Sequence, residues 1–313
     1  MKPAPFAFAR PESLAEALGL LAESRRGSNA KVLAGGQSLL PLLSMRLAAP
    51  EVLIDINALP GLDRIEADEH GVRIGALVRH SDLLVHAGAA RVQPLLSRAL
   101  RLVAHPTIRN RGTTLGSIVH ADPAAEIPMV LRLLGGSVRV VSLAGPVEDG
   151  RSSPREIERE IGAAELFDGP MTSTVRADEL ALSAWFPALP AGSGVAIDEV
   201  ARRHGDYALC GVAAAVSVRQ DGTVATARAG YLSVCEVPTV VELDEPLVGV
   251  RLDEATADRA LAAAGELALT RLDPADDIHA TADYRAQLAR TLTARVLRAA
   301  YDDAIDRTPE RTR

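Results

Sequence analysis

Two adjacent glycines near the start of the chain have the surroundings that a diphosphate site needs. The run Leu33-Ala34-Gly35-Gly36-Gln37-Ser38 follows a short apolar segment and precedes a stretch of helical character. A diphosphate requires backbone N–H groups turned toward it with no Cβ atom in the way, and glycine supplies both this close approach and access to positive φ. The N-terminus of a following helix adds partial positive charge. A Gly-Gly pair is also typical of an ordinary tight turn, so both interpretations stay open at this point.

A second polar run lies further along the chain. It reads Arg111-Gly112-Thr113-Thr114-Leu115-Gly116-Ser117 and is followed by His120, Asp122 and Glu126. Small hydroxyl side chains and a glycine again suit a nucleotide. The alternative is a loop and cap before a helix near 127–134, with Glu126 in its first turn. His120 and Asp122 are too few for a metal site, and no nucleophile has an apparent base beside it.

A third run, Arg202-Arg203-His204-Gly205-Asp206-Tyr207, is equally consistent with a solvated turn. Two familiar nucleotide loops are excluded, because neither the G-x-G-x-x-G fingerprint nor the Gly-Lys-Ser/Thr of a P-loop occurs at the glycine pair. Cys210 and Cys235 lack the number and spacing needed for an iron–sulfur cluster or zinc, and we interpret them as small buried residues in strands. Any redox chemistry therefore requires an organic cofactor.

Three structural units are predicted to position these runs. In the first, apolar patterns predict a strand at 31–33, a helix at 39–47 and a strand at 52–56, which together form a small α/β unit. In the second, strands are predicted at 72–76 and 138–142, with the second polar run in a loop-rich part at 108–117 and a charged loop at 145–159.

The third unit has antiparallel strands followed by helices, as in an α+β module. A strand is predicted at 180–186, and strands at 212–218 and 224–231 flank Asp221-Gly222, which is a strong hairpin signal. Helices are predicted at 254–268 and 282–303, followed by a charged tail.

Composition narrows the class of protein. The 313 residues are 48% hydrophobic and 24% charged, which is ordinary for a globular protein of two or three units. The net charge of -7 and the aromatic content of only 3% argue against nucleic-acid binding. The sequence offers no long uncharged apolar run of the kind a membrane span requires. We therefore expect a cytoplasmic protein.

Taken together, the three runs are far more specific than any one of them. The order A-G-G-Q-S-L-L-P, R-N-R-G-T-T-L-G-S-I-V-H-A-D-P-A-A-E-I-P and R-R-H-G-D-Y-A resembles the medium, FAD-binding subunits of the xanthine dehydrogenase and carbon monoxide dehydrogenase family of molybdenum hydroxylases. The resemblance runs from about Phe6 to about Tyr301. It implies an α+β fold: a two-lobed FAD-binding domain of the PCMH type, similar to vanillyl-alcohol oxidase, and a C-terminal α+β domain of the carbon monoxide dehydrogenase flavoprotein type. The expected divisions are 1–57 and 58–176 for the two lobes, 177–305 for the C-terminal domain and 306–313 for a frayed tail.

The resemblance also implies which residues bind one non-covalent FAD. The first loop, around the diphosphate, comprises Leu33, Ala34, Gly35, Gly36, Gln37, Ser38 and Leu39. The second loop comprises Thr113, Thr114, Leu115, Gly116 and Ser117, and Glu126 is expected near the cofactor, with His120 and Asp122 beside it. Leu182 and Tyr207 are expected near the isoalloxazine ring. The family usually has glycine where this chain has Leu115, so a conformation that needs positive φ would be strained there.

The implied function is electron transfer within a larger enzyme. Molybdenum–pterin on a large partner subunit and iron–sulfur clusters on a small partner subunit would deliver electrons to FAD on this chain, which would pass them to an external acceptor. No catalytic acid–base residue and no metal site are expected in this chain. Two alternatives stay open: a stand-alone flavin oxidoreductase with its own substrate pocket, and a non-catalytic assembly subunit with a decayed FAD site, which Leu115 would favour.

Overall fold

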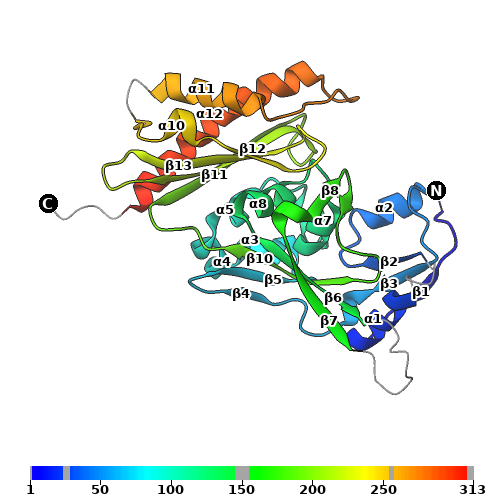
Figure 1. Cartoon of the computed structure of the whole chain (residues 1–313). Coiled ribbons are helices and arrows are strands. Elements are labelled where there is room, and N and C mark those ends of the chain that lie inside the picture. The colour runs from blue at the N-terminus through cyan, green and yellow to red at the C-terminus, as the bar shows by residue number, and fades with distance from the viewer. Residues whose placement is uncertain (1, 24–28, 145–154, 254–256, 309–313) are drawn as a thin grey trace.

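The N-terminal lobe is a three-stranded parallel sheet with two helices (Figure 1). The computed structural model describes residues 2–23, 29–144, 155–253 and 257–308. The sheet has the order β1-β3-β2, and its elements are β1 (Ala7–Ala9), α1 (Leu14–Ala22), β2 (Ala30–Leu33), α2 (Leu39–Ser44) and β3 (Val52–Asp55). Parallel strands need crossover connections, which the two helices provide. Helix α1 begins where the hydroxyl of Ser13 accepts the backbone N–H of Glu16.

The second lobe is a five-stranded antiparallel sheet in the order β4-β5-β10-β6-β7. A short 3-10 helix, Ile56–Ala58, leads into it. Its strands are β4 (Ile65–Ala67), β5 (Gly71–Gly75), β6 (Ser137–Leu143), β7 (Glu156–Gly162) and β10 (Leu180–Pro187). Its helices are α3 (His80–Val85), α4 (Ala87–Val92), α5 (Pro94–Leu100), α6 (Pro106–Arg109), α7 (Thr114–His120), α8 (Glu126–Leu134) and α9 (Ala163–Leu166). A small hairpin of β8 (Phe167–Gly169) and β9 (Thr172–Ser173) follows α9.

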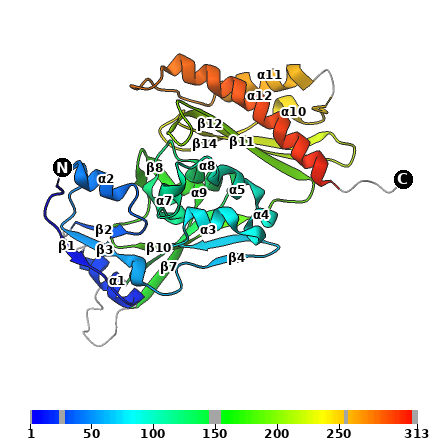
Figure 2. The ribbon, with the colours of Figure 1, turned by 180° about the vertical axis from the view of Figure 1, so that it is seen from behind.

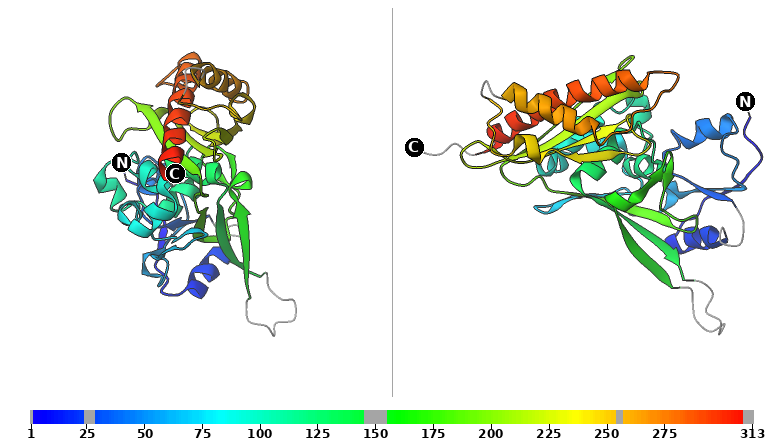
Figure 3. Two further views of the ribbon diagram at one scale, coloured as in Figure 1. Left: turned by 90° about the vertical axis from the view of Figure 1, so that its left-hand side faces the viewer. Right: turned by 45° about the horizontal axis from the view of Figure 1, so that its top comes forward.

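The C-terminal domain is a four-stranded antiparallel sheet covered on one side by helices, as Figures 2 and 3 show. Its strands are β11 (Ser193–Ala201), β12 (Ala208–Val218), β13 (Val224–Leu232) and β14 (Thr239–Glu242), and its helices are α10 (Asp244–Leu247), α11 (Ala257–Leu269) and α12 (Ala282–Arg307). Helix α12 lies on β11 and β12. The contact is so close that a Cβ atom on Gly194 would lie 2.7 Å from the carbonyl carbon of Asp303. The predicted hairpin is confirmed, with Gly222 at φ 81° in its turn.

Helix α8 joins the second lobe to the C-terminal domain. It packs against α5 and β10 on one side and against β12, β13 and β14 on the other. Ile127, Met129, Val130, Leu131 and Leu133 are all buried, as expected for a helix that is apolar all round. Because Glu126 is its first residue, this helix also fixes where that carboxyl group enters the site described below.

Several sequence-based expectations need correction. Strand β10 pairs with β5 and β6, so it belongs to the second lobe, and the boundary expected at 176/177 separates it from its own sheet. The helix expected at 39–47 ends at Ser44, because Arg46 has φ 60° and leaves the helical conformation. Of the loop expected at 145–159, residues 145–154 lie outside the described residues, and 156–159 are part of β7. Residues 306 and 307, expected in the tail, still belong to α12.

Candidate functional site

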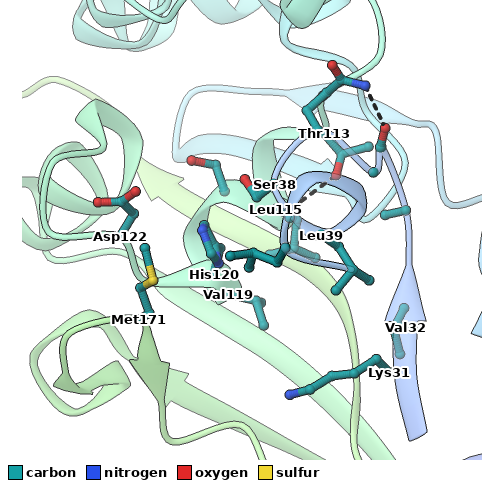
Figure 4. A pocket seen from close by; sticks show the side chains of 18 of the residues that line it. Lys31, Val32, Ser38, Leu39, Thr113, Leu115, Val119, His120, Asp122 and Met171 are labelled. Carbon is teal, nitrogen blue, oxygen red and sulfur yellow. Dashed lines mark hydrogen bonds between the residues drawn. The ribbon is translucent and has the colours of Figure 1, made fainter. Parts of the chain in front are cut away.

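A cavity of roughly 1070 Å³ lies between the two lobes and is lined in part by the C-terminal domain. Its size is at the upper end for ligand pockets in proteins. The N-terminal lobe contributes residues of β2, the glycine run and α2, and the second lobe contributes α7, the start of α8 and the β8–β9 hairpin. Figure 4 shows Asp122, His120 and Met171 grouped on one side of this cavity, and Lys31 and Val32 on the other.

The two lobes meet at Gly35. A Cβ atom built there would lie 2.8 Å from both the Gly112 Cα and the Thr113 nitrogen, and closer still to the Arg111 carbonyl oxygen. Non-bonded carbon atoms normally stay about 3.5–4.0 Å apart, so only glycine fits. Gly36 has φ 75°, which glycine adopts without strain. We call Gly35, Gly36 and the Arg111–Thr113 segment the glycine junction; it brings the first and second polar runs together.

Two polar side chains that sequence reasoning missed hold the glycine junction. The Asn57 amide donates to the Ala34 carbonyl oxygen at 2.9 Å. The Arg79 guanidinium donates to the Asn57 side-chain oxygen at 2.7 Å and to the Arg111 carbonyl oxygen at 2.6 Å. Arg79 thereby bonds to both lobes. No local pattern identified either residue, because their partners lie 22–32 residues away along the chain.

The second polar run is the beginning of helix α7 and not a loop. Thr113 is its N-cap, and the Thr113 hydroxyl accepts the Gly116 N–H at 3.2 Å. Leu115 is only 2% exposed, packs in the hydrophobic core and is not among the non-glycine residues with positive φ. The strain expected at Leu115 is therefore absent, because a helical position suits leucine without needing glycine.

Most of the residues expected to bind the cofactor do line the cavity. They are Ala34, Gly35, Gly36, Gln37, Ser38, Leu39, Thr113, Leu115, Gly116, Ser117, His120, Asp122, Glu126 and Tyr207. Tyr207 is 70% exposed, so its ring is accessible at the edge contributed by the C-terminal domain.

Three expected residues do not line it. Leu33 is not part of the wall, although it ends the strand that leads to the glycine junction. Thr114 is buried, with its hydroxyl 3.2 Å from Nδ1 of His80. Leu182 is 6% exposed and packs in the hydrophobic core within β10, where its carbonyl oxygen accepts the Ala76 N–H. Leu182 therefore does not reach the cavity wall, although the neighbouring Leu180 and Ala181 do.

The side of the cavity formed by the end of α7 and the start of α8 is acidic. Asp122 and Glu126 line it, and Glu199 of β11 is near enough to influence Glu126. Burial raises the pKa of Glu126 to about 8, with further contributions from the carboxylates of Glu199 and Asp122. Burial, aided by Asp198, raises the pKa of Glu199 to about 7. We call Asp122, Glu126 and Glu199 the carboxylate end; sequence reasoning found the first two and missed Glu199.

Glu199 has a second unusual feature. Its Oε2 atom is buried and has no hydrogen-bond partner among the residues that the structure describes. A protonated carboxyl group tolerates such a position far better than a carboxylate does. The carboxylate end can therefore hold a proton near neutral pH. The carboxylate of Asp122 disfavours a polyanion such as a diphosphate there.

Basic side chains lie elsewhere on the wall. Lys31 on β2 and Arg176 in the segment after β9 both line the cavity. Arg176 pairs with Glu179 at 2.8 Å, and the Glu179 side chain is almost completely buried. Sequence reasoning missed both cations, because a single lysine in a strand and an arginine in a loop have no distinguishing pattern.

Neither cysteine forms part of a metal site. Across the described ranges, no group of three or more His, Cys, Asp and Glu residues could hold a metal ion. Cys210 is buried in β12, as expected. Cys235 is only partly buried and follows β13 without belonging to it, contrary to the expectation of a strand, and its sulfur accepts the Asp273 N–H at 3.3 Å.

Comparison with known sequences assigns both parts of the chain. Residues 4–189 match the FAD binding domain in molybdopterin dehydrogenase, and residues 195–300 match the CO dehydrogenase flavoprotein C-terminal domain. The chain belongs to the family of FAD-binding medium subunits of molybdenum hydroxylases. The resemblance found in the three polar runs is thereby confirmed, as is the two-part fold.

Individual relatives of this medium-subunit family align over nearly the whole chain. The sequence is 40% identical to the 6-hydroxypseudooxynicotine dehydrogenase complex subunit alpha of Paenarthrobacter nicotinovorans, covering 95% of both chains. It is 34% identical to the carbon monoxide dehydrogenase medium chain of Hydrogenophaga pseudoflava, covering 96% of this chain and 99% of that one. Quinoline 2-oxidoreductase from Pseudomonas putida 86 has a TM-score of 0.85 at 34% identity, covering 97% of this chain and 100% of the other.

These findings confirm the expected cofactor and enzyme class. The medium subunit is part of an oxidoreductase, its cofactor is FAD, and molybdenum–pterin and iron–sulfur clusters belong to other subunits of such complexes. Among the described helices, none has the length and apolar content needed to cross a bilayer. The residues of the cavity wall fit FAD in one specific respect: the absence of a side chain at Gly35 lets the two glycine-containing segments meet, so that Gly35, Gly36, Gly112 and Thr113 line the cavity together.

Proposed function

We propose that this chain transfers electrons from iron–sulfur clusters on a small partner subunit to an external acceptor, through FAD held in the cavity between its lobes. The observation that carries the proposal is the glycine junction, where Gly35 and the Arg111–Thr113 segment meet without room for a side chain, at the wall of a cavity large enough for a dinucleotide. The family to which the chain belongs supports FAD as the ligand.

The glycine junction and the start of α7 would hold the diphosphate. The wall there combines backbone at Gly35 and Gly36 with the hydroxyl-bearing side chains of Ser38, Thr113 and Ser117. Backbone N–H groups and small hydroxyls are the donors that phosphate oxygens use. Arg79 and Asn57 would act indirectly, by holding the two segments at a fixed separation.

The carboxylate end would accommodate the isoalloxazine ring. This ring carries less charge than the diphosphate, so it suits a wall lined by the carboxylate of Asp122 and the protonated carboxyl group of Glu126. When bound, FAD supplies two-electron and one-electron chemistry that no side chain of the protein can supply. Glu126 and Glu199 would keep a proton close to that ring at neutral pH, because their pKa values are raised to about 8 and about 7.

The proposed electron transfer requires partner subunits that carry the other redox centres. With two cysteines in the whole sequence, this chain cannot ligate iron–sulfur clusters of its own. We propose a large molybdenum–pterin subunit and a small iron–sulfur subunit as its partners, in a cytoplasmic heterotrimer. Relatives named as a complex subunit, a medium subunit and a medium chain support such an assembly. The large subunit would select the substrate.

An absorption spectrum of the purified chain tests the cofactor, and mass analysis of the material released by heat identifies it. We expect flavin bands and released FAD, or stoichiometric uptake of added FAD by the apoprotein. A folded, colourless chain that takes up no FAD would contradict the proposal. Addition of a reduced iron–sulfur partner subunit under anaerobic conditions should then bleach the flavin bands, whereas oxidised partner should not.

Measurements on the same purified chain distinguish the two alternatives from the proposed function. A stand-alone flavin oxidoreductase would reduce its flavin with an organic substrate and without any partner subunit; we expect no such reduction. A decayed cofactor site was favoured only by Leu115, and Leu115 occupies a helical position without positive φ. That observation removes the structural reason for expecting decay.

A further inference from the structure

Met171 has a backbone conformation that its residue type disfavours. It lies in the two-residue turn between β8 and β9 and has φ 54°. Residues with a Cβ atom are uncommon at positive φ, and the third position of a tight turn with this conformation normally carries glycine or asparagine. Such outliers persist where the surroundings maintain them and cluster at ligand sites.

The backbone of Met171 has a clear structural partner. Its N–H donates to the Ala121 carbonyl oxygen at 3.0 Å. Ala121 itself has φ 56° and ends helix α7, directly between His120 and Asp122 of the cavity wall. This hydrogen bond attaches the β8–β9 turn to the end of α7. Glycine at position 171 would make the same bond without strain.

The side chain of Met171 has no comparable structural role. Met171 is 54% exposed, and it belongs to neither of the two hydrophobic clusters formed by the described residues. It does line the cavity, and in Figure 4 it lies next to Asp122 and His120. A large apolar side chain at a position that favours glycine, exposed to a cavity, is explained by a contact with something bound there.

We propose that Met171 is a positioning residue for the flavin: its side chain packs against the isoalloxazine ring of FAD. The inference rests on the proposed function. Asp122 beside it disfavours the diphosphate on this side of the cavity. The methionine thioether is polarizable and makes favourable contacts with aromatic rings. The backbone strain is thus the consequence of placing this side chain at the ring.

Three substitutions separate the side chain from the backbone. Met171→Ala removes the contact and keeps the Cβ atom, Met171→Gly removes both, and Met171→Leu keeps an apolar side chain of similar volume. FAD, FMN and ADP are titrated into each apoprotein, since FMN carries the ring and ADP does not. The melting temperature of each apoprotein is measured without any ligand, and circular dichroism confirms folding.

We expect the Kd for FAD and for FMN to rise about five- to tenfold in Met171→Ala and Met171→Gly. The Kd for ADP should stay within about twofold, and Met171→Leu should stay within about twofold for all three ligands. The apoprotein of Met171→Gly should melt roughly 1–3 °C above that of Met171→Ala, because only alanine keeps a Cβ atom at positive φ.

Unchanged FAD and FMN affinity in a folded Met171→Ala chain would overturn the inference and leave the proposed function intact. A loss of ADP affinity with FMN affinity preserved would also overturn it, since Met171 would then contact the nucleotide half. A wild-type chain that binds none of the three ligands overturns the proposed function itself, and the inference with it.

Discussion

The glycine junction and the carboxylate end lie on the same cavity but are held in different ways. At the junction, backbone meets backbone, and Arg79 and Asn57 bond to carbonyl oxygens across the two lobes at 2.6–2.9 Å. At the carboxylate end, the important groups are titratable side chains, one of which, Glu199, has a buried oxygen without a partner among the described residues. The first arrangement is insensitive to pH and intolerant of added atoms, whereas the second responds to protons.

This difference matches the two halves of the proposed ligand. A diphosphate has a fixed shape and a charge that does not change near neutral pH, so rigid backbone suits it. A flavin ring exchanges protons as it exchanges electrons, so side chains that gain and lose protons near neutral pH suit that half. Four predictions test whether the two ends really differ in this way.

The largest effect is expected from Leu115→Gly, which restores the glycine that the family usually has. Leu115 is buried in the first turn of α7, so the substitution removes a core side chain and adds a glycine to a helix. We expect the free energy of unfolding to fall by about 4–6 kcal/mol. Urea unfolding of the apoprotein measures this. Leu115→Met, which keeps the volume, is the matched control and should lose less than about 1.5 kcal/mol. A stabilised Leu115→Gly chain would show that leucine is strained there after all.

The second-largest effect is expected from a methyl group added at the glycine junction. Gly35→Ala places a Cβ atom 2.8 Å from the Thr113 nitrogen, so the two segments must separate. We expect the Kd for FAD to rise about ten- to a hundredfold. The control is Gly19→Ala in α1, where an added Cβ atom meets nothing within 4 Å. Gly19→Ala should leave the Kd unchanged and slightly stabilise the chain, since alanine favours the helix. Equal affinities in the two variants would remove the junction from the binding site.

Removing the side chain that bridges the junction should have a smaller effect. Arg79→Ala deletes hydrogen bonds to Asn57 and to the Arg111 carbonyl oxygen. Two charge-assisted bonds are lost, but the backbone contacts at Gly35 remain, so we expect the Kd for FAD to rise about tenfold. Arg139→Ala removes a surface pair with Glu158 and serves as the control, with an effect on stability below about 1 kcal/mol. Isothermal titration of both apoproteins with FAD and ADP checks this, and equal losses in the two variants would contradict it.

The difference between the glycine junction and the carboxylate end also explains which site residues could be predicted from the sequence. Gly35, Gly36 and Thr113 were found because glycine pairs and small hydroxyls are local signals with a direct chemical meaning. The helix starting at Thr114 was missed, since a glycine and a serine in its first turns look like a loop. Arg79, Asn57 and Glu199 were missed because each acts through a partner distant in sequence.

The burial of individual side chains could not be predicted from sequence patterns either. Leu182 was assigned to the ring by resemblance, and only the structure shows that β10 lies in the middle of its sheet with Leu182 in the core. Glu126 was placed correctly in the first turn of α8, but nothing in the sequence indicated that its carboxyl group would be desolvated and face Glu199. Candidate site residues were therefore predictable from the sequence where their chemistry depends on neighbouring residues. The raised pKa of Glu126 was not predictable, because it depends on burial and on a residue distant in sequence.

The effect expected at the carboxylate end is of a different kind, because it appears only as a pH dependence. The pKa of Glu126 is raised by burial from an ordinary value of 4.5 to about 8 in the folded chain. The folded state therefore binds the proton more tightly than the unfolded state, so this contribution to stability is present below about pH 4.5 and is lost as the pH rises toward 8. Glu199, with its pKa raised to about 7, acts in the same direction. We expect the melting temperature of the apoprotein to fall between pH 5 and pH 8.5.

Glu126→Gln should flatten that fall, because a neutral amide cannot ionise, and Glu199→Gln should flatten it less. The exposed Glu165→Gln is the control and should reproduce the wild-type slope. In contrast, Gly35→Ala and Arg79→Ala should shift the melting curves without changing their dependence on pH, since the junction contains no group that titrates in this range. If a junction variant altered the slope while Glu126→Gln did not, the proton would reside elsewhere on the cavity wall, and the assignment of the acidic side to the flavin ring would lose its electrostatic basis.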